Sequence, residues 1–131
     1  MLAPPPAIAP AVVRALERFQ CSLEQTFGRR LRELVLFGSQ ARGNAHEDSD
    51  VDVLVVVDEL TEKERRIAID LAYDANAAER DAWVGISPMV YSAAQTSELR
   101  QRERLIMSDI ARDGHWLMGP KPPADQRERA R

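Results

Sequence analysis

The sequence predicts an α/β (α+β) fold in which a small mixed sheet of three or more strands carries helices packed against it. Two segments, 34–37 and 51–57, are continuous apolar runs, and the second is almost entirely β-branched, which is typical of buried strands. Two longer segments, 11–27 and 61–80, repeat apolar residues every three or four positions, as one face of a helix does. Strands that alternate with such helices favour a sheet covered by helices.

The first half of the chain is expected to form one helix and two strands. The helix covers 11–27 and stops at Gly28, because glycine is a natural helix C-cap. Its inward face is formed by residues at helical spacing: Val12, Leu16, Phe19, Leu23 and Phe27. The strands at 31–37 and 51–57 follow, joined by a loop at 38–49 that is rich in turn-forming residues.

The second half is expected to continue as helix, strand and helix. Thr61, with Glu64 three residues later, forms a capping-box pattern that starts the first of these helices. The inward face of that helix is predicted to carry Ile67, Leu71, Ala75 and Ala78. The strand is expected at 83–91, where Pro88 indicates an edge position or a bulge because proline cannot donate to a strand ladder. The last helix is expected at 95–113 and ends before a glycine.

Length and composition describe one domain, which we expect at 11–118. The 131 residues are 44% hydrophobic and 30% charged, which suits a globular domain with a core of its own. Prolines in 1–10 and the Pro-rich, charged segment 119–131 predict a disordered lead and a disordered tail. Cys21 is the sole cysteine, no apolar run could span a membrane, and the start is no secretion signal, so a cytoplasmic location is expected.

The charge balance excludes one class of partner. The net charge is −3 and the pI is near 5.4, so the basic footprint of a nucleic-acid-binding protein is missing. This argues against a polynucleotide template, although it leaves a single nucleotide open as a substrate.

Two carboxylates, Asp50 and Asp52, lie where the polar loop becomes the second strand. They point the same way, since side chains alternate along a strand. Like charges on neighbouring sites repel, so the pair makes sense if Mg²⁺ or Mn²⁺ lies between them, because such ions take oxygen ligands. The alternative, that both carboxylates only shape the turn and the start of the strand, stays open at this point.

The turn after the first strand supplies groups that could bind a phosphate beside the two carboxylates. Gly38 lets a ligand approach the backbone closely, and Ser39 adds a hydroxyl and an N–H. If residues 39–42 open a helical turn, its first amides favour a phosphate. Arg42 is either a surface residue or a cation that helps to neutralise a triphosphate. His46 is expected to be solvated, with a metal-binding role as the minor alternative.

The motif GSQARG at 38–43, followed by SDVD at 49–52, resembles the signature of minimal nucleotidyltransferases in the DNA-polymerase-β-like superfamily. The resemblance is strongest over 34–57, where a Gly-Ser turn, a polar loop and Asp-x-Asp on the next strand all agree. It implies the polymerase-β-like fold and a metal-dependent transfer of a nucleoside monophosphate, AMP from ATP, to a hydroxyl.

The resemblance also implies roles for individual residues. Asp50 and Asp52 are the expected catalytic residues and the ligands of Mg²⁺ or Mn²⁺. The residues expected to bind the nucleotide are Gly38, Ser39, Arg42 and Ser49. The sequence departs from the family pattern on the third strand, where active members carry a third carboxylate and this chain has Ser87 at about that place. A hydroxyl binds Mg²⁺ less tightly than a carboxylate and is a poor base.

The size of the domain resembles that of antitoxins from prokaryotic two-gene modules whose other half is a helical HEPN ribonuclease toxin. This implies a HEPN-type partner, which would be the protein that accepts AMP. Two alternatives remain open because the third carboxylate is missing. One is a catalytically weak antitoxin that neutralises its partner by direct contact, and the other is a nucleotide-binding sensor.

Overall fold

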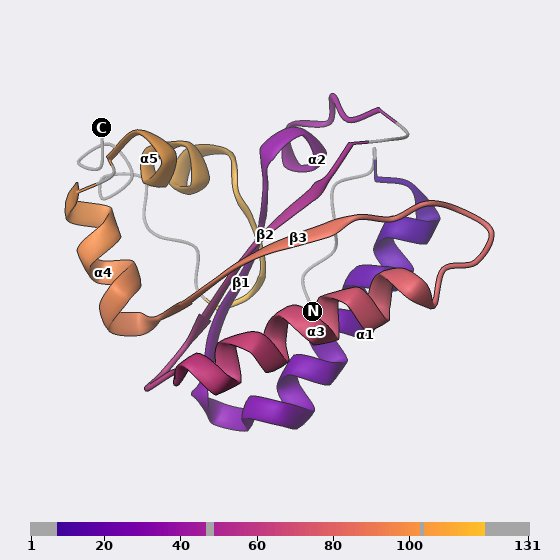
Figure 1. Ribbon diagram of the computed structural model, residues 1–131. Helices are drawn as coiled ribbons and strands as arrows, with labels where there is room; N and C mark the ends of the chain where they lie inside the picture. Colours follow the sequence, from indigo (N-terminus) through magenta and orange to yellow (C-terminus); the bar gives the residue numbers. More distant parts are fainter. Residues whose placement is uncertain (1–7, 47–48, 103, 120–131) are drawn as a thin grey trace.

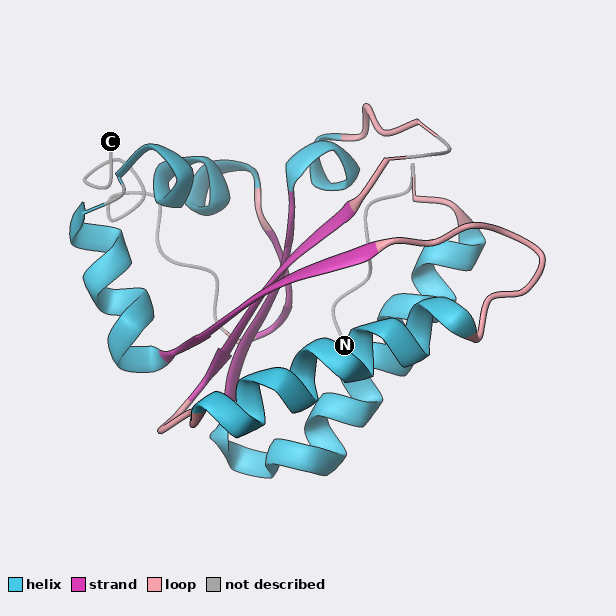
Figure 2. Cartoon of the chain, in the orientation of Figure 1, coloured by secondary structure: helices cyan, strands magenta, loops and turns pink. Residues whose placement is uncertain are grey.

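The computed structural model describes residues 8–46, 49–102 and 104–119. Its elements are shown in Figures 1 and 2 and occur in the order α1 (Pro10–Phe27), the 3-10 turn η1 (Gly28–Arg30), β1 (Leu31–Phe37), α2 (Gly38–Arg42), β2 (Val51–Val57), α3 (Glu62–Ala77), β3 (Ile86–Ser92), α4 (Ala93–Arg102), α5 (Arg104–Asp113) and β4 (His115–Met118). The expected disordered lead and tail fall mainly on 1–7 and 120–131, which lie outside the described residues.

The four strands form one mixed sheet in the order β3-β2-β1-β4. β1 runs antiparallel to both β2 and β4, whereas β3 runs parallel to β2. β1 and β2 are therefore interior strands, which explains why each is a continuous apolar run rather than an alternating one. The predicted fold class, a small mixed sheet with packed helices, is confirmed.

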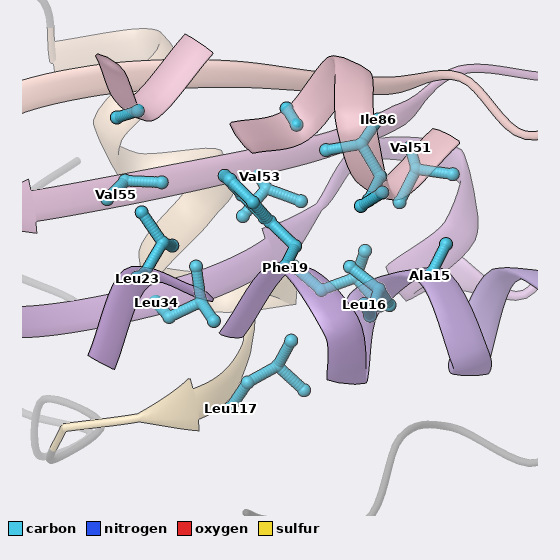
Figure 3. Close-up of a cluster of buried hydrophobic side chains, with 14 of the residues drawn as sticks. Ala15, Leu16, Phe19, Leu23, Leu34, Val51, Val53, Val55, Ile86 and Leu117 are labelled. Atoms are coloured by element: carbon cyan, nitrogen blue, oxygen red, sulfur yellow. The ribbon is translucent and has the colours of Figure 1, made fainter. Parts of the chain in front are cut away.

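Helices α1 and α3 cover one face of the sheet, and α5 covers part of the other (Figure 1). Figure 3 shows the first core, where Phe19 and Leu16 of α1 lie against Leu34, Val53 and neighbouring strand residues. The second core contains Val35, Leu54, Val56, Met107, Ile110 and Trp116. No helix within the described ranges is long and apolar enough to cross a membrane.

The capping box predicted at the start of α3 is confirmed, because Thr61 Oγ1 accepts from the Glu64 N–H at 3.2 Å and a Glu64 carboxylate oxygen accepts from the Thr61 N–H at 3.1 Å. The predicted inward face is partly wrong. Ile67 is 37% exposed, and the buried row is Ala68, Ala72 and Ala75. The three small side chains let α3 approach the sheet closely, so the helix turns its alanines rather than its larger residues inward.

The C-terminal segment differs from the single helix predicted at 95–113. It forms α4 and α5, and then β4, which the sequence did not predict and which pairs with β1. Leu99 of α4 and Ile110 of α5 pack against the same second core.

Strand β3 is an edge strand, as Pro88 predicted, and its free side is closed by side chains. The Ile86 N–H donates to Asn76 Oδ1 at 2.9 Å, and the Asn76 amide donates to the Ile86 carbonyl at 3.4 Å. At the other end, the Ser92 N–H donates to Gln95 Oε1 at 2.9 Å. Pro88 has no N–H to offer. Most of the β3 backbone N–H groups that face away from β2 therefore already have a partner or are missing, which protects the edge from pairing with another chain.

We expect Asn76→Ala to lower the free energy of unfolding by about 1–3 kcal/mol, because it leaves the half-buried Ile86 N–H without its partner. Urea denaturation measures the change. The control is Asp70→Ala, an exposed position on the same helix, which should stay within about 0.5 kcal/mol of the wild type. Equal effects of the two substitutions would show that Asn76 does not hold the edge.

Candidate active site

The Gly-Ser turn begins where β1 ends. Residues 38–42 form the short helix α2, so the helical turn expected after the first strand is present. Gly38 has φ of +74°, a left-handed conformation that favours glycine. A Cβ atom placed on Gly38 would overlap the Asp52 carboxylate oxygen Oδ2. The backbone conformation therefore favours glycine at this position, and a Cβ atom here would displace the Asp52 carboxylate.

Asp52 comes to this position through the register of the sheet. It pairs with Phe37, the residue before the turn, so strand pairing places its carboxylate at the Gly38 backbone. Burial, and secondly the charge of Asp50, raise the pKa of Asp52, and the Arg42 guanidinium opposes them. Asp50 and Arg42 therefore each lie close enough to Asp52 to act on its charge.

Asp50 lies two residues before Asp52 and immediately precedes β2. The next residue, Val51, donates its N–H to the Gly85 carbonyl at 2.9 Å, which holds the start of β2 against the chain that leads into β3. Asp50 is exposed. Its carboxylate is thus available to a ligand, while Val51 is fully buried in the core beneath it.

Ser49 lies apart from the two aspartates. Its hydroxyl accepts from the His46 N–H at 2.7 Å, and its own N–H donates to the His46 carbonyl at 3.0 Å. Ser49 lines a second pocket together with Val51 and Gln40, whereas Asp50 lines the first. Ser49 therefore closes the loop that leads into β2.

The remaining expected residues are partly open to solvent. Ser39 is half-buried, and its carbonyl accepts from the Asn44 N–H at 3.1 Å. Arg42 and His46 are exposed. Cys21 is exposed on α1.

Ser87 lies at about the place where a third carboxylate would be expected beside Asp50 and Asp52. It is the direct partner of Asp52 in the parallel register of β2 and β3, so its side chain lies on the same face of the sheet. Ser87 is exposed. In the part of the chain that the structure describes, no group of three or more acidic, histidine or cysteine side chains could hold a metal ion. The donor set is therefore two carboxylates and a hydroxyl.

A pocket of about 820 Å³ opens beside Asp50 and Ser87. It extends along the outer side of β3 to the C-terminal half of α3, and its wall includes Trp83 and Tyr73. The sequence pattern predicted a strand at Trp83 and indicated a functional role for neither residue. The signal that could have found them is their exposure, 57% for Trp83 and 70% for Tyr73, which only the folded structure shows.

Residues 16–106 match the sequence model of the nucleotidyltransferase domain, which covers more than half of the chain. The chain belongs to the nucleotidyltransferase domain family. A chain from Methanocaldococcus jannaschii that is named as a protein adenylyltransferase, MJ0141, is 34% identical over 83 residues. That match covers 61% of this chain and 79% of the relative.

Two solved structures share the fold of this nucleotidyltransferase domain. The spectinomycin adenyltransferase AAD(9) from Enterococcus faecialis, crystallised with ATP and spectinomycin, aligns with a TM-score of 0.65 and 16% identity, over 91% of this chain and 64% of that one. A toxin-antitoxin structure with AMP-PNP aligns with a TM-score of 0.50 and 23% identity, over 87% of this chain and 79% of that one. The polymerase-β-like nucleotidyltransferase fold implied by the resemblance is thereby confirmed.

We expect Gly38→Ala to destabilise the domain and to abolish binding of MgATP, because the new Cβ would displace the Asp52 carboxylate. The matched control is Gly28→Ala, since Gly28 also has a positive φ, +57°, but has open space where a Cβ would go. Both substitutions should cost roughly 1–3 kcal/mol of backbone strain. Only Gly38→Ala should affect MgATP in a calorimetric titration; equal nucleotide affinities would contradict a role for the Gly38–Asp52 contact.

Proposed function

We propose that this nucleotidyltransferase domain transfers AMP from ATP to a hydroxyl of a partner protein in a metal-dependent reaction. The observation that carries the proposal is the Asp52 carboxylate, held against the Gly38 backbone with Asp50 beside it. The arrangement is unfavourable for the isolated chain, since burial and a like charge raise the pKa of Asp52. A binding function gives a reason for keeping it.

The residues present fit a hard divalent cation. Asp50 and Asp52 offer carboxylate oxygens on one face of the sheet, and their mutual repulsion is relieved by a positive charge. Bound Mg²⁺ or Mn²⁺ would stabilise the negative charge that develops on the phosphates during transfer. Gly38 lets the Asp52 carboxylate lie against the backbone of the turn, because glycine has no Cβ atom.

The other residues act on the triphosphate or on the loop. Ser39 offers a hydroxyl and an N–H to the terminal phosphates, and Arg42 lowers their negative charge. Ser49, which is also expected to bind the nucleotide, forms hydrogen bonds with His46 that close the loop before β2. It thereby helps to hold Asp50 and Asp52 in place.

The reaction needs little covalent chemistry from the protein. The acceptor oxygen forms a bond to the α-phosphorus while the bond from that phosphorus to the bridging oxygen of the β-phosphate breaks. Pyrophosphate leaves with the electron pair, and the hydroxyl proton passes to solvent water. Positioning and charge stabilisation therefore carry most of the catalysis.

The acceptor that we propose is a HEPN-type helical toxin. The proposal rests on the motif at 38–43 and 49–52, which resembles that of minimal nucleotidyltransferases, and on the size of the domain, which resembles that of antitoxins paired with such toxins. ATP is the proposed donor, because the relative MJ0141 is named as a protein adenylyltransferase. Ser87 favours a second function, because it leaves the site one carboxylate short. In this function the domain is an antitoxin that binds its partner and a nucleotide with little turnover.

Calorimetry and labelling test the proposed function together. ATP with Mg²⁺ should bind the wild type, and ATP with a chelator should bind far more weakly. The chain is then mixed with a HEPN-type helical protein and with ATP labelled at the α-phosphate. Label on the partner supports the enzyme, whereas protection from the toxin without label supports the binding antitoxin. An absence of MgATP binding by the folded wild type would contradict both.

A further inference from the structure

The ladder between β2 and β3 begins beside the two carboxylates. Its first pair is Val51 with Ile86. Val51 is also the residue between Asp50 and Asp52. Its N–H donates to the Gly85 carbonyl at 2.9 Å, so one backbone hydrogen bond joins the start of β2 to the chain that enters β3. Because the two carboxylates repel each other, their separation depends on how firmly this end of the ladder is held.

The Trp83 side chain packs against this junction. A Cβ atom placed on Gly85 would lie 2.5 Å from Cη2 and 2.7 Å from Cζ2 of the indole ring, so the ring occupies the space that a side chain at 85 would need. The described glycines with a positive φ do not include Gly85, so its backbone conformation does not require glycine. The packed ring is therefore the reason for a glycine at this position.

Trp83 has a local rather than a global place in the fold. It belongs to neither of the two clusters of buried side chains that the described residues form, and it is 57% exposed. Its removal is therefore not expected to open a cavity in a core. Its contact with Gly85 matters locally, because glycine has the greatest backbone freedom of any residue and a ring against it reduces that freedom. At the next residue, Asn76 holds the Ile86 N–H at 2.9 Å.

We propose that Trp83 is a positioning residue that holds the two carboxylates ready for a divalent cation. The ring restrains Gly85, and the Gly85 carbonyl holds the N–H of Val51. Val51 in turn fixes the backbone on which Asp50 and Asp52 stand. The inference rests on the proposed AMP transfer and adds a residue that prepares its metal site. Residues that orient metal ligands without touching the ion contribute about 10–100-fold to metal affinity.

Amide hydrogen exchange of the metal-free domain tests the first step. In Trp83→Ala the Val51 N–H should exchange about tenfold faster than in the wild type, because local opening no longer has to displace the ring. Val55, fully buried in the middle of the same strand, is the internal reference and should not change. A residue needed only for the overall fold would instead speed exchange at both positions and lower the midpoint of urea unfolding.

Calorimetry tests the second step. Trp83→Ala should bind MgATP about tenfold more weakly than the wild type, because its carboxylates are less well placed for the metal. Binding of ATP in chelator should be unchanged, since the ring does not touch the nucleotide. Tyr73→Ala is the matched control: Tyr73 is 70% exposed and lines the same pocket, but the atoms nearest to the Cβ position of Gly85 all belong to Trp83. It should change neither the exchange nor the affinity.

Gly85→Ala is an independent variant, because the new Cβ would displace the indole ring while Trp83 is kept. It should reproduce the faster Val51 exchange and the weaker MgATP binding. In the Trp83→Ala background there is no ring to displace, so adding Gly85→Ala should change either quantity by less than about twofold. Additive effects of the two substitutions would show that the two residues act separately, and would overturn the inference.

The remaining outcomes separate this inference from the proposed function. If the wild type binds no MgATP, the proposed function fails and the metal site that Trp83 would serve fails with it. If the wild type binds MgATP, the inference alone is overturned by any of three results: Trp83→Ala binds MgATP equally well, its Val51 exchange is unchanged, or it also loses affinity for ATP in chelator, which would place the ring at the nucleotide.

Discussion

Asp52→Asn is expected to stabilise the metal-free domain while removing its affinity for MgATP. Burial and the Asp50 charge raise the pKa of Asp52, so the charged carboxylate is less favourable in the folded chain than in the unfolded one. The native state then binds more protons than the unfolded state, and stability falls as pH rises from the ordinary value of 3.8 through the raised folded pKa. Asparagine carries no charge and does not show this loss.

The same substitution should weaken MgATP binding by at least about 100-fold, since even residues that only orient a metal ligand contribute 10–100-fold to metal affinity. Urea denaturation in chelator at neutral pH measures the stability, and calorimetry measures the binding. Asp70→Asn, at an exposed position on α3, is the control and should change neither. A less stable Asp52→Asn domain that still binds MgATP would make Asp52 a structural residue.

The opposite directions of the two effects separate function from structure. A residue kept for the fold lowers stability when it is replaced, whereas a residue kept for a ligand often raises it. At the candidate site the residue types do not suit the local structure, because two like charges lie at the start of an otherwise apolar strand. That conflict lies in the residue order itself, which is why the sequence alone could indicate Asp50 and Asp52.

The features that could be predicted from the sequence are those that depend on short-range residue patterns. Strand alternation placed Asp50 and Asp52 on one face, the capping box located the start of α3, and Pro88 identified the edge strand. Each of these depends on residues close together in the chain. By contrast, β4 pairs with β1 across about 80 residues of the chain, and nothing in its four residues specifies that partner.

The contact between Gly38 and Asp52 could not be predicted from the sequence for a similar reason. It depends on the register that pairs Phe37 with Asp52, and a shift of one residue would turn the carboxylate to the other face. The pocket beside Asp50 is built from α3 and the segment before β3, so it exists only after the helix packs on the sheet. Exposure of an aromatic ring cannot be read from its local sequence.

Ser87→Asp is expected to raise the rate of AMP transfer by about 100-fold, the lower end of what general acid–base catalysis contributes. Ser87 is in register with Asp52 and on the same face, so the new carboxylate would complete a three-acid site and could take the acceptor proton. Without metal the variant should be less stable than the wild type, since a third negative charge joins Asp50 and Asp52. Mg²⁺ should restore the stability.

Ser87→Asn is the matched control, because it has the shape of aspartate without the charge, and it should leave the rate within about threefold of the wild type. The size of the gain separates the two proposed functions. A large gain means that the domain holds donor and acceptor correctly and lacks only a base. If Ser87→Asp binds Mg²⁺ and ATP more tightly but transfers no faster than Ser87→Asn, the acceptor is not presented for attack. The domain would then act by binding, and the partner would be silenced by contact rather than by AMP.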